Sequence, residues 1–108
     1  MTDRSDWHPS DVQLMESLIS LGCNLDEVLE IEHYFIAPDK NSVALLLQAF
    51  PKIGHELKHI SEYDGEAGNY LVCSVEMRSP AEVTKRTGNL GQLATLYKAI
   101  YDGWGTSV

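Results

Sequence analysis

The sequence predicts an α+β fold, in which helices pack on one face of an antiparallel sheet. Two stretches, residues 29–35 and 70–77, alternate apolar and polar side chains with the period of two that half-buried strands show. Two other segments begin with strong helix-capping residues, Asp39 and Ser79. The 108 residues, 44% of them hydrophobic, are enough to bury one core, so we expect a single domain.

The first predicted element is a helix that begins near Asp11. Ser10, followed three residues later by Gln13, is a capping-box pattern that satisfies free backbone N–H groups at a helix start. Gly22 stands where a helix end favours a left-handed residue. Residues 1–9 are polar and are predicted to form an N-terminal tail.

The first predicted strand starts near Val28 and is closed by Pro38 and Asp39. One of its faces carries Leu29, Ile31, His33 and Phe35. The opposite face carries Glu30, Glu32 and Tyr34. Asp39 can cap a second helix whose apolar residues lie within 43–50. Pro51 lacks a backbone N–H, so this helix is predicted to kink or end there.

The middle of the sequence predicts an antiparallel hairpin. We expect a strand around residues 55–60, a glycine-rich turn over residues 64–69, and a second strand over residues 70–77. In the second strand, alternation groups the mostly apolar residues Leu71, Cys73, Val75 and Met77 on one face. The other face, with Tyr70, Val72, Ser74 and Glu76, is then predicted to point away from the core.

A third helix is predicted to begin after Ser79. This residue can act as the N-cap, Pro80 suits the first helical position, and Glu82 follows three residues after the cap. Gly88 and Gly91 each cost about 1 kcal/mol in a helix interior, so they could divide the helix.

The C-terminal segment YDGWGT, residues 101–106, is predicted to be the last strand. The glycines beside Trp104 indicate a bend or bulge, and partial burial of Trp104 in the sheet is favoured over a purely binding role. After the first helix the order is strand, helix, hairpin, helix, strand, which is a ferredoxin-like βαββαβ sandwich. It occupies residues 10–108, and the extra N-terminal helix would pack on the open sheet face or against an edge.

Charged and aromatic residues are predicted to gather on the sheet face that the helices leave open. The candidate partner-binding residues are Glu30, Glu32, Tyr34, Tyr70, Glu76, Asp102 and Trp104. The net charge of −8 disfavours direct binding of nucleic acid and favours a basic protein partner. Charged sheet faces are also commonly just solvated, so that interpretation remains beside the binding one.

One short pattern suggests a zinc hydrolase, because residues 55–59 read HELKH and match H-E-x-x-H. That chemistry needs His55 and His59 on one helical turn, whereas a strand would hold them about 13 Å apart. His33 is interpreted as a hydrogen-bonded core histidine and Cys73 as a small buried hydrophobe. We therefore predict no catalytic residue, no metal and no cofactor, and thus a protein that is not an enzyme.

The sequence has no apolar run of about 18 residues, and its first residues are polar and acidic. Its two cysteines do not form a disulfide framework. These features predict a cytoplasmic protein that does not contact a membrane.

Three stretches of the chain resemble the regulator of ribonuclease activity B family, which are bacterial inhibitors of ribonuclease E. They are the terminal YDGWGT, the first-strand residues 29–34, and residues 49–54 at the end of the second helix. The resemblance implies a non-catalytic regulator that binds and inhibits ribonuclease E and so modulates RNA decay. We expect its acidic surface to engage a basic, Arg-rich segment of the nuclease through charge-assisted hydrogen bonds.

Two alternatives stay open at this point. A small-molecule-sensing module could use the same fold, with its ligand at a dimer interface, and the sequence does not decide the oligomeric state. The best-known members of the family also continue into a strongly acidic tail, whereas this sequence has two residues after Thr106. If that tail carries the inhibitory contact, this protein binds a different partner.

Overall fold

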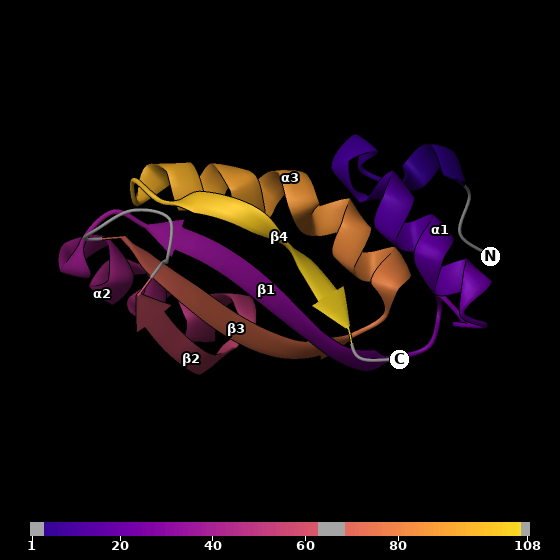
Figure 1. Ribbon diagram of the computed structural model, residues 1–108, viewed down its shortest axis with the longest axis horizontal. Helices are drawn as coiled ribbons and strands as arrows, with labels where there is room; N and C mark the ends of the chain where they lie inside the picture. Colours follow the sequence, from indigo (N-terminus) through magenta and orange to yellow (C-terminus); the bar gives the residue numbers. More distant parts are fainter. Residues whose placement is uncertain (1–3, 63–68, 107–108) are drawn as a thin grey trace.

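The computed structural model describes residues 4–62 and 69–106 as an antiparallel sheet with helices packed against it (Figure 1). The helices and strands, in chain order, are α1 (Val12–Ser20), β1 (Leu29–Ala37), α2 (Lys40–Ala49), β2 (Glu56–Glu62), β3 (Tyr70–Arg78), α3 (Pro80–Leu96) and β4 (Ile100–Thr106). The predicted α+β class is confirmed, and the order of elements from β1 onward is the predicted one. The predicted turn over residues 64–69 lies outside the described residues, apart from residue 69.

The four strands lie in the order β2-β3-β1-β4, and each neighbouring pair is antiparallel. Residues directly opposite each other on neighbouring strands project to the same side of a sheet. Opposite pairs between β1 and β3 include Ile31 with Glu76, His33 with Ser74 and Phe35 with Val72. All six of these side chains therefore point to one face, which we call the helix face; the other side is the open face.

Two hydrophobic clusters hold the helices on the helix face. The first joins α2 and α3 to the sheet through buried residues that include Phe35, Val43, Leu46, Phe50, Val72, Leu90 and Ala94. The second joins α1 and the N-terminal segment to the start of α3 through Trp7, Met15, Leu18, Ile31, Val83 and Trp104. The second cluster contains Ile31 of the helix face and Trp104 of β4, the edge strand, so α1 packs at the β4 edge and not on the open face.

The N-terminal segment is part of the fold from residue 4 onward, where a polar tail was predicted. Trp7 is buried, with 6% of its surface exposed. The His8 backbone N–H donates to the Thr84 hydroxyl at 2.9 Å. The buried Asp11 carboxylate accepts hydrogen bonds from the hydroxyls of Thr84 at 2.8 Å and Thr87 at 2.6 Å. These hydrogen bonds hold residues 8–11, just before α1, against α3.

Local sequence signals predicted most helix ends correctly. Asp39 caps α2 by accepting from the Ser42 backbone N–H at 2.8 Å, and Ser79 caps α3. Pro51 lies in the short 3-10 helix Phe50–Ile53 that follows α2. The predicted Ser10 cap was wrong, because the Ser10 hydroxyl pairs with the ring of His8 and α1 begins two residues later.

The face assignment predicted for β3 was also wrong. Val72, Ser74 and Glu76 point to the helix face, whereas Met77 is 63% exposed on the opposite side. The predicted alternation along β3 was correct. The face that contains Leu71 and Met77 was assigned to the core because it is the more apolar one, and it is the open face instead. Tyr70 lies opposite Ala37 and packs against the first cluster, so Tyr70 and Glu76 do not belong to the open face.

The bulge predicted beside Trp104 is confirmed in β4. The register with β1 shifts there, with Tyr34 opposite Gly103 and Phe35 opposite Tyr101, which leaves Asp102 as the extra residue. Gly103 has a φ of +111°, a conformation that favours glycine. The bulge turns the Trp104 side chain onto the helix face.

Gly103→Ala is expected to lower the free energy of unfolding by about 1–2 kcal/mol, because an L-residue is strained at positive φ. The matched control is Gly105→Ala in the same strand, where the φ is not positive. A Cβ at either position would meet no atom within 4 Å, so urea unfolding of the two variants compares backbone strain alone. Equal losses would contradict this assignment of the bulge.

Among the described residues, no helix combines the length and the apolar character that crossing a membrane requires.

Candidate functional site

The seven residues predicted to bind a partner fall into two groups. Glu30, Glu32 and Tyr34 lie on the open face, and Asp102 is exposed at the bulge of β4. Tyr70, Glu76 and Trp104 lie on the helix face, where Glu76 and Trp104 are each 6% exposed. The structure therefore brings the first three together on one surface, buries Glu76 and Trp104, and leaves Tyr70 partly buried against the first cluster.

Lys58 shapes the charge of the open face. The register between β2 and β3 shifts around it, with Leu57 opposite Ser74 and His59 opposite Cys73. The Lys58 ammonium donates to the Glu32 carboxylate and lies 3.7 Å from that of Glu30. One cation thus faces two carboxylates, and the cluster keeps an excess of negative charge.

Hydrogen bonds stabilise the ionised form of Glu32. The bond from Lys58 and then the bond from the Tyr34 hydroxyl, at 2.9 Å, lower the pKa of Glu32. Burial, together with the bond to Glu32, raises the pKa of Tyr34 to about 12, so that Tyr34 remains a hydrogen-bond donor. The side chain of Glu30 is 60% exposed and is the more accessible of the two carboxylates.

Apolar side chains occupy the other end of the open face. Ile36 of β1 lies opposite Leu71 of β3 and Ile100 of β4. Ile100 is 63% exposed, and the other two are partly buried. The open face therefore has an acidic half around Glu30 and Glu32 and an apolar half around Ile36.

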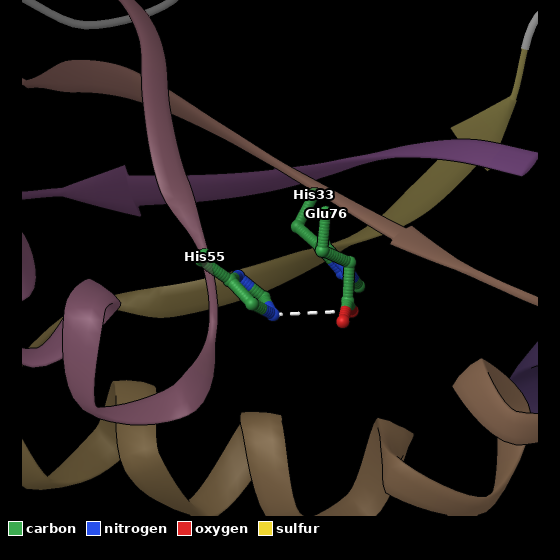
Figure 2. A group of neighbouring side chains, drawn as sticks. All are labelled: His33, His55 and Glu76. Atoms are coloured by element: carbon green, nitrogen blue, oxygen red, sulfur yellow. Dashed lines mark hydrogen bonds and ion pairs between the residues drawn. The ribbon is translucent and has the colours of Figure 1, made fainter.

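The helix face holds a buried cluster of two histidines and a glutamate. His33 comes from β1, Glu76 from β3 and His55 from the loop just before β2, and all three side chains project toward α3 (Figure 2). The Glu76 Oε2 lies 2.7 Å from the His33 Nε2 and 3.1 Å from the His55 Nε2. The two imidazole rings stack with their centroids 4.4 Å apart.

The backbone before β2 determines the position of His55. The 3-10 helix Phe50–Ile53 ends at Gly54, whose φ of +78° turns the chain. The His55 backbone N–H then donates to the Phe50 carbonyl at 2.9 Å. This turn directs the imidazole beneath the sheet, where the side chain is 3% exposed.

Each imidazole in the cluster has a partner at both nitrogens. The Tyr101 hydroxyl lies 2.8 Å from the His33 Nδ1, and the Ser74 hydroxyl lies 2.9 Å from the His55 Nδ1. Neutral rings satisfy this pattern, since each can donate from Nε2 to Glu76 and accept at Nδ1 from a hydroxyl.

The charges in the cluster follow from burial and hydrogen bonding. Burial lowers the pKa of His33 and outweighs the opposing bond to Glu76. Burial acts to raise the pKa of Glu76, but hydrogen bonds from His33, His55 and Arg78 lower it well below its usual range. The favoured state at neutral pH is therefore a neutral His33 beside an ionised Glu76.

A cavity of about 480 Å³ adjoins this cluster. Its lining consists of Ile53, His55, Glu76, Arg86, Asn89, Leu90 and Leu93. Pockets of this size commonly accept small ligands. His55 and Glu76 are thus at the wall of this cavity, although each side chain is only 3% exposed.

The sequence identified parts of this cluster but did not assemble it. His33 is fully buried and hydrogen-bonded, as predicted. His55 belongs to the HELKH string, and the predicted strand is confirmed there, because β2 begins at Glu56. His59 lies opposite Cys73, away from the cluster. The sequence did not indicate that Glu76 points to the helix face. In that orientation it contacts His33, which is 43 positions away in sequence.

Comparison with known proteins gives consistent results. Residues 8–106 match the family described as "Regulator of ribonuclease activity B". A protein of that name from Xenorhabdus nematophila is 34% identical over 86% of this chain and 69% of its own length. Its counterpart from Salmonella typhi is 32% identical over 86% of this chain and 70% of its own length. A third, from Pseudoalteromonas translucida, is 25% identical over 94% of this chain and 95% of its own length.

Proposed function

The chain belongs to the regulator of ribonuclease activity B family, and we propose that it binds and inhibits ribonuclease E through the open face of its sheet. In this proposal the protein has no catalytic activity of its own and does not contact RNA directly. It reduces RNA decay by occupying a basic segment of the nuclease. Both cysteines are free thiols, in keeping with a reducing cytoplasm as the location we propose.

The observation that carries this proposal is the composition of the open face. Its acidic half offers Glu30 and Glu32, which suit the guanidinium groups of an Arg-rich segment. Its apolar half, around Ile36 and Ile100, offers the dehydrated contact that the centre of a protein interface needs. A basic segment that also carries apolar residues would match both halves.

The net charge of −8 supports a protein partner rather than RNA, since binding of nucleic acid depends on neutralising phosphates. The same charge speeds the encounter with a basic segment and makes the binding sensitive to salt. Lys58 already pairs with Glu32, so an incoming arginine would meet Glu30 first and would then compete with Lys58.

The experiment is a binding titration of ribonuclease E with the Glu30→Lys/Glu32→Lys variant at low and moderate salt. We expect at least about tenfold weaker binding, because two attractive charges become repulsive at the interface. Lys58→Gln should change binding in the opposite direction, since it removes the cation that competes with the partner for both carboxylates.

The matched control is Glu27→Lys/Glu82→Lys, which makes the same change in net charge away from the open face. Both of its side chains are exposed, Glu27 before β1 and Glu82 in the first turn of α3. Circular dichroism checks that each variant is folded. If the two double variants bind equally, the open face is not the docking surface.

A further inference from the structure

We propose that His33, His55 and Glu76 form a binding site for a divalent transition-metal ion, and that zinc fits it best. This inference does not depend on the proposed binding of ribonuclease E, because the three residues lie on the opposite side of the sheet. Each residue offers one ligand atom, and these atoms all lie within 4.8 Å of one another.

The identity and spacing of the three ligand atoms favour zinc. Two imidazole nitrogens and one carboxylate oxygen are a set that zinc uses when a fourth position is left for water or a ligand. Bonds of about 2.0–2.2 Å in a tetrahedron place neighbouring ligand atoms roughly 3.3 Å apart. The Nε2 atoms of His33 and His55 lie 2.7 Å and 3.1 Å from the Glu76 Oε2, about 0.6 Å and 0.2 Å short of that separation. The two imidazole rings are stacked, so binding an ion requires them to tilt until both Nε2 atoms point at it.

The groups around the three residues suit metal ligation as well. A ligating histidine usually donates its other ring N–H to an oxygen, which fixes its tautomer and orientation. The hydroxyl oxygens of Tyr101 and Ser74 occupy that position beside the Nδ1 atoms of His33 and His55. With an ion at both Nε2 atoms, each imidazole proton moves to Nδ1, and the rings remain neutral.

Arg78 orients the carboxylate of Glu76. Its Nε donates to Oε1, which leaves Oε2 directed toward the two imidazoles. The adjoining cavity is lined by His55 and Glu76, so an ion can enter from this side and keep its fourth position open to it.

The proposed site differs from the zinc site that the HELKH string suggests. Both use His55, but the string would add His59, which lies opposite Cys73 on the other side of the sheet. Zinc binding should therefore require His55 and Glu76 and should be indifferent to His59. The His59→Gln variant is the matched control, because it removes one imidazole from the same short segment.

The experiment uses the full chain, treated with a chelator, dialysed, and titrated with zinc sulfate alone by calorimetry. We expect one zinc ion per chain and a rise in Tm of roughly 10 °C at a hundredfold excess of zinc over its Kd. His55→Gln and Glu76→Gln should each weaken zinc binding about tenfold to a hundredfold or more, while His59→Gln should bind like the unchanged protein.

Cobalt substitution provides a measurement that needs no variant. Co²⁺ bound to the unchanged protein should give the intense visible absorption of a tetrahedral site and should be displaced by one equivalent of zinc. The proposal is overturned if the unchanged protein binds no zinc at micromolar concentration. It is equally overturned if the cobalt spectrum is octahedral, or if His59→Gln loses zinc while His55→Gln retains it.

Discussion

Replacing Trp104 by alanine is expected to lower the free energy of unfolding by about 3–5 kcal/mol, the range for truncating a large buried aromatic residue. Trp104 is 6% exposed and packs in the second cluster with Trp7, Met15 and Val83. Its loss would leave a cavity where α1, α3 and β4 meet. Since domains are stable by about 5–15 kcal/mol, urea unfolding should show a large shift of the midpoint.

Trp104→Phe is the control for this prediction. It keeps most of the apolar volume and removes an indole N–H that has no hydrogen-bond partner among the described residues. We therefore expect a loss of less than about 1.5 kcal/mol, as for other substitutions that conserve volume. An alanine variant that keeps its stability but loses nuclease binding would contradict this structural role. It would instead support the partner-binding role that the sequence first suggested.

The order of elements could be predicted from the sequence because its signals are local. The Asp39 cap bonds to a backbone N–H three residues away, as does the Ser79 cap. The alternation along β1 and the glycine beside Trp104 likewise act within one strand. Helix caps and strand alternation depend on local backbone geometry, so a short stretch of sequence is enough to predict them.

The interior polar groups could not be predicted, because their partners are distant in sequence. Hydropathy assigned Glu76 to the solvent side, since an isolated carboxylate is costly to bury. The cost is offset by hydrogen bonds from His33 and His55, which come from other parts of the chain. Asp11 is a second case. Its carboxylate is buried just before α1 and accepts hydrogen bonds from two hydroxyls of α3, more than 70 residues away in sequence.

The residues assigned to the docking surface differ between sequence and structure because the interior partners of polar residues could not be predicted. Glu30 and Glu32 were predicted on the open face because β1 has a clear apolar face opposite them. In β3 both faces carry apolar residues. Which of the two faces points toward the helices therefore depends on which polar residues find hydrogen-bond partners in the interior. The reversal removed Glu76 from the proposed docking surface and placed it in the buried cluster beside the cavity.

Phe35→Ala is the second substitution with a large expected effect, again a loss of about 3–5 kcal/mol. Phe35 is fully buried in the first cluster. Its ring lies 5.5 Å from that of Phe50 and 5.1 Å from that of Tyr101, distances at which aromatic pairs add to the stability gained by burial. Urea unfolding monitored by circular dichroism measures the loss, and Phe35→Leu should recover most of it.

The consequence of this substitution extends beyond the cavity itself. The Tyr101 ring packs against Phe35, and its hydroxyl bonds to the Nδ1 of His33. Loss of the Phe35 ring should loosen Tyr101 and with it the orientation of the buried imidazole. The His33 ring resonances should therefore broaden in the NMR spectrum of Phe35→Ala and remain sharp in Phe35→Leu. Unchanged His33 resonances in the alanine variant would mean that Tyr101 is held by its hydroxyl contact rather than by packing against Phe35.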